Sequence, residues 1–509
     1  MFVAVKRLLA TTRWYLASGV LVIAGLALWP LAALIRLGLA GPASFDDLAS
    51  GAILGSGGLM LLVGLLAVIL GTATGWLTAN CRFPGRAWLR VAQMLPLATP
   101  SYLLAATLTD VGSLHGLRIH GFGWAILVLT VSTYPYIFLL SSDCFSRLGQ
   151  DQLDVCRTLG LRPWASFRRV ALPMAIPAIG AGLALCLMEV VNELGAVNLL
   201  GVQTLSGGIL ERWQAEGNPS GAAQLALIAL SVVLMLVALE RWWRRRSRRW
   251  DGGCGRTGSQ AWHLEGMRAV VAQGVCGISP LLSLGIPLWW VALRWESLEG
   301  SLDPELLSLT LRSLGLGLVA SLLTMVLALV LALGRRWIRN RALSGIGFVA
   351  SMGYAIPGAV LALGLIQVGS PLGWAPILLL LFGYGDRFIA VGKGSIDSAF
   401  ERLTPSIDEA GASLGHAWWG MLRRVHLPLL RGPLLVGGLL VFVDTVKELP
   451  LTFALRPFDF DTLAVRVYQY AGDERLGTAM IPALMILSLG LIATLVLVIQ
   501  LERQREAGT

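Results

Sequence analysis

The amino-acid sequence predicts an all-α membrane protein with about twelve transmembrane helices. Of its 509 residues, 56% are hydrophobic and only 14% are charged, a balance that is not typical of a soluble domain. Apolar runs of about twenty residues recur along the chain, and a helix needs this length to cross the hydrocarbon core of a bilayer. The runs do not alternate apolar and polar residues, so they favour helices over the strands of a barrel.

Six spans are predicted in each half of the chain. In the first half they lie near 15–38, 54–79, 88–111, 122–143, 174–197 and 221–241. In the second half they lie near 271–294, 309–334, 343–367, 374–395, 429–452 and 479–501. No small-residue cleavage site follows the first span, so we expect it to remain as an uncleaved anchor.

Arginine clusters test this layout. They follow the second, fourth, sixth, eighth and tenth spans, so every cluster falls on the same side of the membrane. Loops on the opposite side are richer in acid, as in the segment 296–305. The positive-inside rule therefore predicts that both termini are cytoplasmic. Because the net charge of +10 lies in short clusters between apolar runs, the sequence argues against nucleic-acid binding.

One polar stretch occurs twice, 255 residues apart. The first cassette is DVCRTLGLRPWASFRRVALP, Asp154–Pro173, and the second is EAGASLGHAWWGMLRRVHLP, Glu409–Pro428. The matched positions include Gly160 and Gly415, Trp164 and Trp419, Leu172 and Leu427, and Pro173 and Pro428. A polar, arginine-bearing stretch repeated at half the chain length indicates duplication of a six-span unit.

The repeat divides the chain into two predicted domains. The first is 1–243, with the first cassette in a loop at 151–173, and the second is 263–509, with the second cassette in a loop at 406–428. Residues 244–262 are basic and then Gly-rich, which is typical of a cytoplasmic linker. Because each half has an even number of spans, both enter the membrane in the same direction. We therefore expect parallel repeats related by an axis along the membrane normal.

Each cassette is predicted to form two short helices with a glycine at the turn between them. Trp164 with Phe167, and Trp419 with Leu422, are spaced to form one apolar face of the second helix. The Leu-Pro pair then starts the next span. Such an element lies either on the lipid headgroups or in the groove of a partner protein, and the fixed register of two copies favours the partner.

The cassettes resemble the EAA loop of ABC importer permeases, in which acid-Ala-Ala-x-x-x-Gly is followed by nine residues and a hydrophobic-x-Leu-Pro end. Glu409 and Ala410 match the second copy, where Gly411 takes the third position. In the first copy Asp154 is followed by Val155 and Cys156, while the spacing is kept. The resemblance implies that the cassettes contact a separate ATPase. The implied coupling residues are Asp154, Gly160, Trp164, Phe167, Leu172, Pro173, Glu409, Ala410, Gly415, Trp419, Leu427 and Pro428.

The same resemblance implies the partners and the location. Two copies of a cytoplasmic ABC ATPase are expected, one on each cassette. A substrate-binding protein is expected to dock at the outer face, on loops near 198–219 and 453–477. The chain itself is expected to bind no cofactor, because ATP and magnesium belong to the ATPase. The expected location is a bacterial plasma membrane, with lipid around the helices.

Two longer stretches narrow the resemblance. KELPLTFALRPFDFDTLAVRVYQYAGDERL, Lys447–Leu476, and NELGAVNLLGVQTLSGGI, Asn192–Ile209, resemble the fused twelve-span permeases of the ferric-iron importer family. Thiamine and phosphonate permeases are relatives of that family. The resemblance implies ferric iron as the cargo, moved by alternating access. Thiamine, phosphonate and polyamine remain alternatives.

Five ionisable residues near the ends of the fifth and eleventh spans are candidate pathway or gate residues: Glu189, Glu193, Asp444, Lys447 and Glu448. Charge at membrane depth is costly and indicates function. The acids are paired at i,i+4, so each half is predicted to present two acids on one helix face. For a cationic cargo they would lower the electrostatic barrier. A structural ion pair between spans is an equal alternative for Lys447.

Four further residues lie within predicted spans. Asp386 and Arg387 in the tenth span form a candidate buried charge pair, for which a structural role is favoured. Pro100 and Pro357 occupy matching positions and are predicted to break or kink their helices where the two halves meet. A packing kink is the alternative for both prolines.

The sequence lacks the patterns of several enzyme classes. Gly392-Lys393-Gly394-Ser395 is not a phosphate-binding loop, because Arg387 stands where its first glycine is needed and Gly394 follows the lysine. The six cysteines and five histidines show no metal-ligand spacing, so no metal site is predicted. A membrane enzyme therefore has no support. An ion-coupled secondary transporter can also carry two parallel six-span halves and remains the rival function.

Overall fold

The computed structural model describes residues 2–42, 46–147, 158, 163–247, 262–297, 305–338, 340–404, 406–414 and 418–506. These residues are almost entirely helical. The strands among them are β1 (Cys81–Arg82) and β2 (Trp262–His263), which pair in parallel. The predicted all-α fold is confirmed.

Nine helices in the described ranges are long and apolar enough to cross a membrane. They contain α1 (Phe2–Ala40), α2 (Asp47–Asn80), α5 (Phe122–Arg147), α8 (Leu172–Asn192), α11 (Pro219–Ser247), α12 (Met267–Pro280) with α13 (Ile286–Leu293), α14 (Leu306–Ile338), α20 (Leu427–Val446) and α23 (Met480–Glu506). Each coincides with a span predicted from the sequence.

Two further spans are bent pairs of helices. The first joins α3 (Arg86–Ala92) and η1 (Leu95–Ala98) to α4 (Ser101–Leu114) with a bend of 91°. The second joins α15 (Arg341–Val349) and η6 (Gly353–Ala355) to α16 (Gly358–Gly369) with a bend of 114°. Counting each pair as one span brings the described total to eleven.

Both bends occur at the prolines singled out in the sequence. Pro100 and Pro357 each stand directly before the second helix of the pair. The residues before them, Thr99 and Ile356, are extended, with ψ of 113° and 127°. A proline removes a backbone donor and its ring excludes helical geometry from the preceding residue, which ends the first helix at this point. The predicted helix breaks are confirmed, whereas their place where the two halves meet stays a prediction.

The remaining predicted span, 374–395, corresponds to α17 (Pro376–Arg402). This helix has 27 residues, long enough to cross a bilayer. It carries Asp386, Arg387 and Lys393, and it is not among the helices whose composition alone marks them as spans. The total of twelve spans therefore stays a prediction.

The chain forms two compact units, which are not the two halves of the sequence. The 305–465 unit contains residues 1–42, 217–227 and 305–465. The 43–216 unit contains residues 43–216, 228–304 and 466–509. Helix α1, at the start of the chain, therefore packs with helices from the second half. The domain boundaries derived from the repeat describe duplication of the sequence and stay a prediction.

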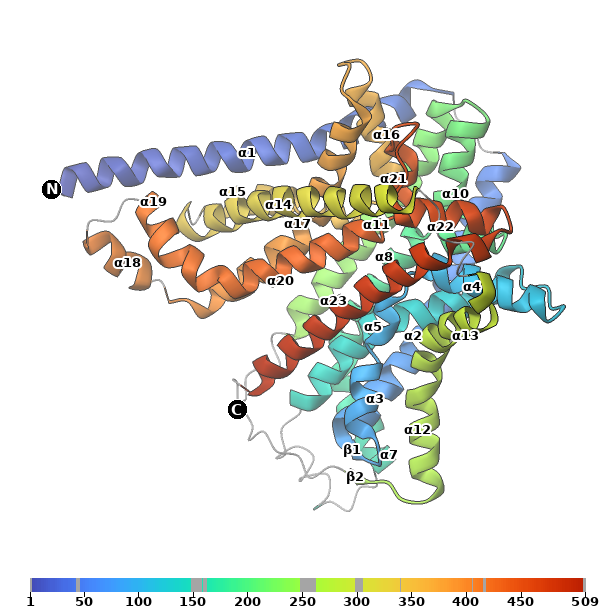
Figure 1. Cartoon of the computed structure of the whole chain (residues 1–509). Coiled ribbons are helices and arrows are strands. Elements are labelled where there is room, and N and C mark those ends of the chain that lie inside the picture. The colour runs from blue at the N-terminus through green and yellow to red at the C-terminus, as the bar shows by residue number, and fades with distance from the viewer. Residues whose placement is uncertain are drawn as a thin grey trace. The chain divides into compact units, whose positions relative to one another are not determined.

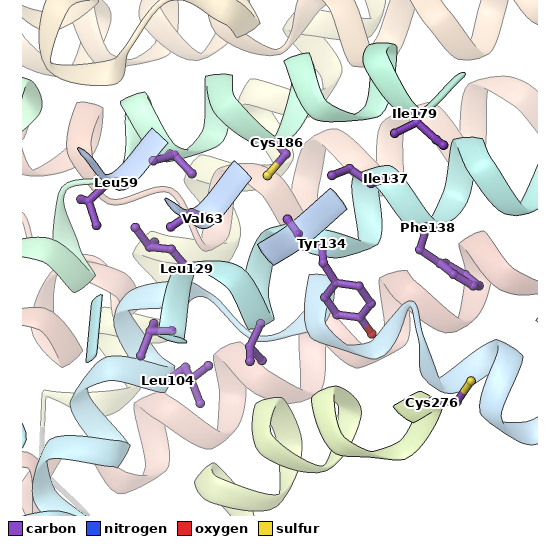
Figure 2. Close-up of a cluster of buried hydrophobic side chains, with 14 of the residues drawn as sticks. Leu59, Val63, Leu104, Leu129, Tyr134, Ile137, Phe138, Ile179, Cys186 and Cys276 are labelled. Atoms are coloured by element: carbon purple, nitrogen blue, oxygen red, sulfur yellow. The ribbon is translucent and has the colours of Figure 1, made fainter. Parts of the chain in front are cut away.

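The core of the 43–216 unit lies between α2, α5 and α8. Figure 2 shows Leu59, Val63, Leu129, Ile137 and Cys186 within this buried cluster. Glycines bring the backbones together, because small residues allow close approach of membrane helices. A Cβ on Gly71 of α2 would lie 2.9 Å from the Cβ of Ile137, and one on Gly182 of α8 would lie 2.8 Å from its Cα. Helix α5 is thus held tightly on two sides at Ile137.

The core of the 305–465 unit is built by α14, α17 and α20, with α1 running beside α14 (Figure 1). Buried residues of this core include Leu331, Ile389, Ile396 and Leu430. Helix α16 packs against α1, and a Cβ on Gly364 would lie 2.6 Å from the carbonyl oxygen of Pro30. The bent pair of this unit thus packs against α1, and its first helix, α15, also packs against α14.

Matched hydrogen bonds occur in the two units. The Leu205 N–H donates to Ser56 Oγ at 2.8 Å, and the Leu463 N–H donates to Ser313 Oγ at 2.8 Å. These bonds tie α10 (Leu205–Leu210) to α2 and the start of α22 (Leu463–Gly472) to α14. They support the duplicated unit, whereas the parallel orientation of the repeats stays a prediction.

Candidate functional site

The second cassette consists of short helices that lead directly into α20. Helix α18 (Ser406–Ser413) contains Glu409 and Ala410, both exposed. After Gly415, which lies outside the described residues, α19 (Trp418–Met421) continues through the π-helical turn η7 (Leu422–His426) into α20.

The first cassette has the same final part. Asp154 and Gly160 lie outside the described residues. Helix α7 (Pro163–Ser166) continues through the π-helical turn η2 (Phe167–Ala171) into α8. The two π turns are thus 255 residues apart, at the offset of the sequence repeat.

Pro173 and Pro428 explain these turns. Each is the second residue of its long helix, lacks an N–H, and would place its ring against the carbonyl four residues earlier. In a π turn the hydrogen bond spans five residues, as from Leu172 N–H to the Phe167 carbonyl and from Leu427 N–H to the Leu422 carbonyl. The long helices begin at Leu172 and Leu427 as predicted, but no break separates them from the cassettes. Motion of a cassette can therefore pass directly into its membrane helix.

The cassettes expose their tryptophans and arginines. The exposed fractions are 70% for Trp164 and 57% for Trp419, and the arginine pairs at 168–169 and 423–424 are exposed as well. Phe167 and Leu422 are buried, whereas the tryptophans are exposed. The Trp164 ring stacks on the Phe167 ring with centroids 5.4 Å apart, so this pair forms the predicted apolar face, and the Trp419–Leu422 face stays a prediction. Large exposed aromatic side chains beside arginine are typical anchors of a protein interface.

A polar cluster anchors the second cassette. Arg336 at the end of α14 donates from Nε to Asp408 of α18 at 2.7 Å, and also to the carbonyls of Phe400, Leu403 and Thr404. The fully buried His426 places Nε2 3.0 Å from Asp408 Oδ1. Arg336 therefore joins α14, the last turn of α17, and α18.

An aromatic cluster takes this place in the 43–216 unit. The rings of Trp76, Phe145 and Phe167 are buried and lie 5.1–6.1 Å apart. Phe145 matches Phe400 in the repeat, whereas His426 is matched by Ala171. The first cassette thus rests on apolar packing, and the second on apolar packing together with the Arg336–Asp408 ion pair. Sequence reasoning missed both clusters, and Asp408, next to Glu409, was the available signal for the polar one.

The acids at the far ends of α8 and α20 bind backbone groups. Glu193 follows the last residue of α8, and its Oε1 accepts the Ala196 N–H of α9 (Gly195–Leu199) at 2.9 Å. Its Oε2 accepts the hydroxyl of Ser101, the first residue of α4. The Glu193 carboxylate thus connects α8 and α9 to the bent helix pair.

Glu448 has the matching place in the 305–465 unit and is buried. Its Oε1 accepts the Leu451 N–H of α21 (Pro450–Leu455) at 3.0 Å, and its Oε2 accepts the Thr452 N–H at 2.9 Å. The Nε of Arg387 lies 3.7 Å from Glu448 Oε1. Arg387 also donates to the carbonyl of Ile356, directly before the break at Pro357, at 2.8 Å.

The other candidate pathway residues are half-buried. Glu189 accepts the Tyr136 hydroxyl at 3.1 Å, and Lys447 pairs with Asp444 of its own chain segment at 2.8 Å. Since α8 ends at Asn192 and α20 at Val446, Glu193 and Glu448 lie beyond the helix ends. The expectation of two acids on one helix face is therefore wrong. Each second acid binds the N–H groups of the next short helix, which competes with continuing the long one.

Metal and disulfide chemistry find little support in the part of the chain described. No group of three or more His, Cys, Asp or Glu residues that could hold a metal ion occurs there. Cys81, Cys144, Cys186 and Cys276 are free thiols. The contacts described above for Glu193 and Glu448 are hydrogen bonds and, for Glu448, an ion pair within one unit.

Comparison with known proteins adds independent information. Residues 67–249 match the family model described as binding-protein-dependent transport system inner membrane component. The chain is 27% identical to the Fe(3+)-transport system permease protein FbpB 2 of Haemophilus influenzae, over 84% of this chain and 85% of the relative. It is 30% identical to the molybdenum transport system permease protein ModB of Escherichia coli, over 37% of this chain and 93% of the relative. It is 26% identical to the sulfate transport system permease protein CysT of Escherichia coli, over 36% of this chain and 72% of the relative.

Proposed function

Because the chain belongs to the family of binding-protein-dependent transport system inner membrane components, we propose that it forms the entire membrane pathway of an ABC importer for ferric iron. Members of this family are transporter permeases that work with an ATPase and a binding protein. The multi-pass helical structure accords with this role. In the proposal this chain has no ATP site, and ATP and magnesium bind to the partner.

The doubled cassette is the observation that carries the proposal. Each copy has an exposed tryptophan and, within the π turn that follows it, an exposed arginine pair, and the turn continues into a membrane helix. In the proposal one ATPase docks on each cassette at the cytoplasmic face, where both termini also lie. ATP-driven approach of the two ATPases displaces α8 and α20 and switches the pathway between inward- and outward-open states. The binding protein delivers cargo at loops near 198–219 and 453–477.

Support for ferric iron comes from the extent of similarity. The iron permease relative aligns over 84% of the chain, so it includes both halves, whereas the molybdenum and sulfate permeases align over 37% and 36%. Half-buried acids, Glu189 and Asp444, would also lower the barrier for a cation more than for an oxyanion.

Docking is tested by removing the exposed tryptophans. We expect Trp164→Ala and Trp419→Ala each to weaken co-purification of the ATPase by about tenfold or more, since buried interface aromatics commonly contribute 2 kcal/mol. Trp295→Ala is the matched control, because Trp295 is 63% exposed and lies outside both cassettes. If the variant with both changes, Trp164→Ala and Trp419→Ala, inserts normally into the membrane and still captures as much ATPase as the wild type, the cassettes are not the docking sites.

An oxyanion importer is the second candidate, favoured by the higher identity to the molybdenum permease. The discriminating experiment measures ATPase stimulation in the reconstituted complex with binding protein loaded with ferric iron, molybdate, sulfate, phosphonate, thiamine or polyamine. Stimulation by iron alone is expected, and stimulation by another cargo alone contradicts the iron assignment.

The same preparation tests the rival transporter class. An importer of the proposed kind takes up cargo only with ATP and its ATPase, and collapse of ion gradients leaves uptake unchanged. Uptake that needs no ATPase and stops with an ionophore would identify an ion-coupled secondary transporter instead.

A further inference from the structure

We propose that Glu193 and Glu448 are positioning residues, which latch each bent helix pair to the membrane helix that rises from a coupling cassette. This inference rests on the proposed import function and assigns the two acids to transmission of motion rather than to contact with cargo. The two latches are the Glu193–Ser101 contact and the Glu448–Arg387–Ile356 contact.

The latch in the 43–216 unit is made by hydrogen bonds from neutral donors. Glu193 is attached to α8 through the chain, caps α9 through the Ala196 N–H, and accepts the Ser101 hydroxyl at the start of α4. Ser101 directly follows the break at Pro100. Displacement of α8 is therefore transmitted to the bent pair next to the break, where no continuous helix resists bending.

The latch in the 305–465 unit includes a cation. Glu448 holds two N–H groups of α21, and Arg387 of α17 bridges from Glu448 to the Ile356 carbonyl at the break. The Arg387 and Glu448 side chains are only 9% and 4% exposed. At the position that matches Ser101 stands Gly358, where a Cβ would lie 3.1 Å from Glu448 Oε1. The absence of a side chain thus lets the carboxylate reach the first residue of α16.

Both acids lie at the N-terminal ends of helices, where partial positive charge favours a carboxylate. This placement occurs at the same offset of 255 residues as the cassettes. Each half therefore has a continuous path from the cassette, through a π turn and a long helix, to the acid and then to the helix break.

The chemistry of the two latches predicts different responses to neutralisation. A glutamine at 193 still accepts the Ala196 N–H and can bond the Ser101 hydroxyl through its amide. A glutamine at 448 loses one acceptor and leaves the buried Arg387 without its carboxylate, which is costly. If the acids acted by attracting cargo, each neutralisation would remove one charge from the pathway and the two variants would behave alike.

The test uses the complete complex of permease, ATPase and binding protein in liposomes, with ferric iron as the cargo. The measured quantity is the ratio of cargo taken up to ATP hydrolysed. We expect Glu448→Gln to lower this ratio about tenfold and Glu193→Gln to change it less than about twofold. Glu265→Gln is the matched control, since Glu265 is exposed and outside both latches.

A second variant distinguishes loss of the latch from misfolding of the protein. The double change Arg387→Gln with Glu448→Gln removes the uncompensated charge and is expected to recover at least part of the ratio lost in Glu448→Gln. Equal losses in Glu193→Gln and Glu448→Gln, or no recovery in the double variant, overturn the latch. Absence of iron-stimulated ATPase activity in the wild-type complex instead contradicts the proposed function, so the two failures are distinct.

Discussion

Replacing Asp408 with alanine tests the polar anchor of the second cassette. Asp408 is 22% exposed and accepts from Arg336, which is 11% exposed. Breaking a fully buried ion pair costs about 3–5 kcal/mol. Arg336 keeps its bonds to the carbonyls of Phe400, Leu403 and Thr404, so its charge stays partly satisfied. We therefore expect a loss of about 2 kcal/mol in the free energy that holds α18 in place.

Hydrogen exchange of the α18 amides measures this loss, because local opening sets their exchange rates. A loss of about 2 kcal/mol corresponds to exchange about 30-fold faster. The Asp397→Ala variant is the matched control. Asp397 lies on α17 and binds Arg335 and Lys393 rather than α18, so less than about twofold change is expected there. The segment 163–171 supplies an internal reference, because the aromatic cluster holds it. Unchanged exchange of α18 in Asp408→Ala would refute the anchor.

Two further predictions concern the 43–216 unit. Gly182→Ala is expected to lower the free energy of unfolding by about 1–3 kcal/mol, because the added methyl group overpacks against the Ile137 backbone. Gly57→Ala is the control and is expected to be neutral or stabilising, because no atom lies within 4 Å of the added Cβ. Thermal inactivation in detergent compares the two variants. Burial raises the pKa of the Cys81 thiol to about 11. Because the thiolate is the reactive form, the rate of alkylation by a maleimide is expected to rise about tenfold per pH unit between about pH 8 and 10 in a variant whose only cysteine is Cys81. An alkylation rate that stops rising near the ordinary thiol pKa would contradict the burial of Cys81. Equal thermal stability of the two glycine variants would contradict the close packing of Gly182.

The sequence predicted the elements that depend on local patterns. Apolar length alone located the long helices, and the two prolines located the breaks, because a proline acts on its immediate neighbours. The fixed register of the cassettes also predicted that Leu172 and Leu427 begin membrane helices. These features need only residues that are close together in the chain.

The remaining features depend on pairs that are distant in sequence. The Arg336–Asp408 bond joins residues 72 apart, and although Asp408 lies next to Glu409 in the cassette, no local pattern indicates Arg336 as its partner. The acids at 193 and 448 were found through the repeat, but their role as helix caps required knowing that α8 and α20 end at Asn192 and Val446. The grouping of α1 with second-half helices has no signal in hydropathy. The apolar run 374–395 predicted a span at α17, but composition alone does not mark this helix as one, because Asp386, Arg387 and Lys393 lie within it.

The mass of the intact complex shows directly whether one ATPase binds to each cassette. Native mass spectrometry of the purified wild-type complex is expected to show two ATPase copies for each copy of this chain. Trp419→Ala and Trp164→Ala should each shift the population toward one copy, while Trp295→Ala should not. A wild-type complex with a single ATPase copy, or with none, would contradict the doubled coupling site.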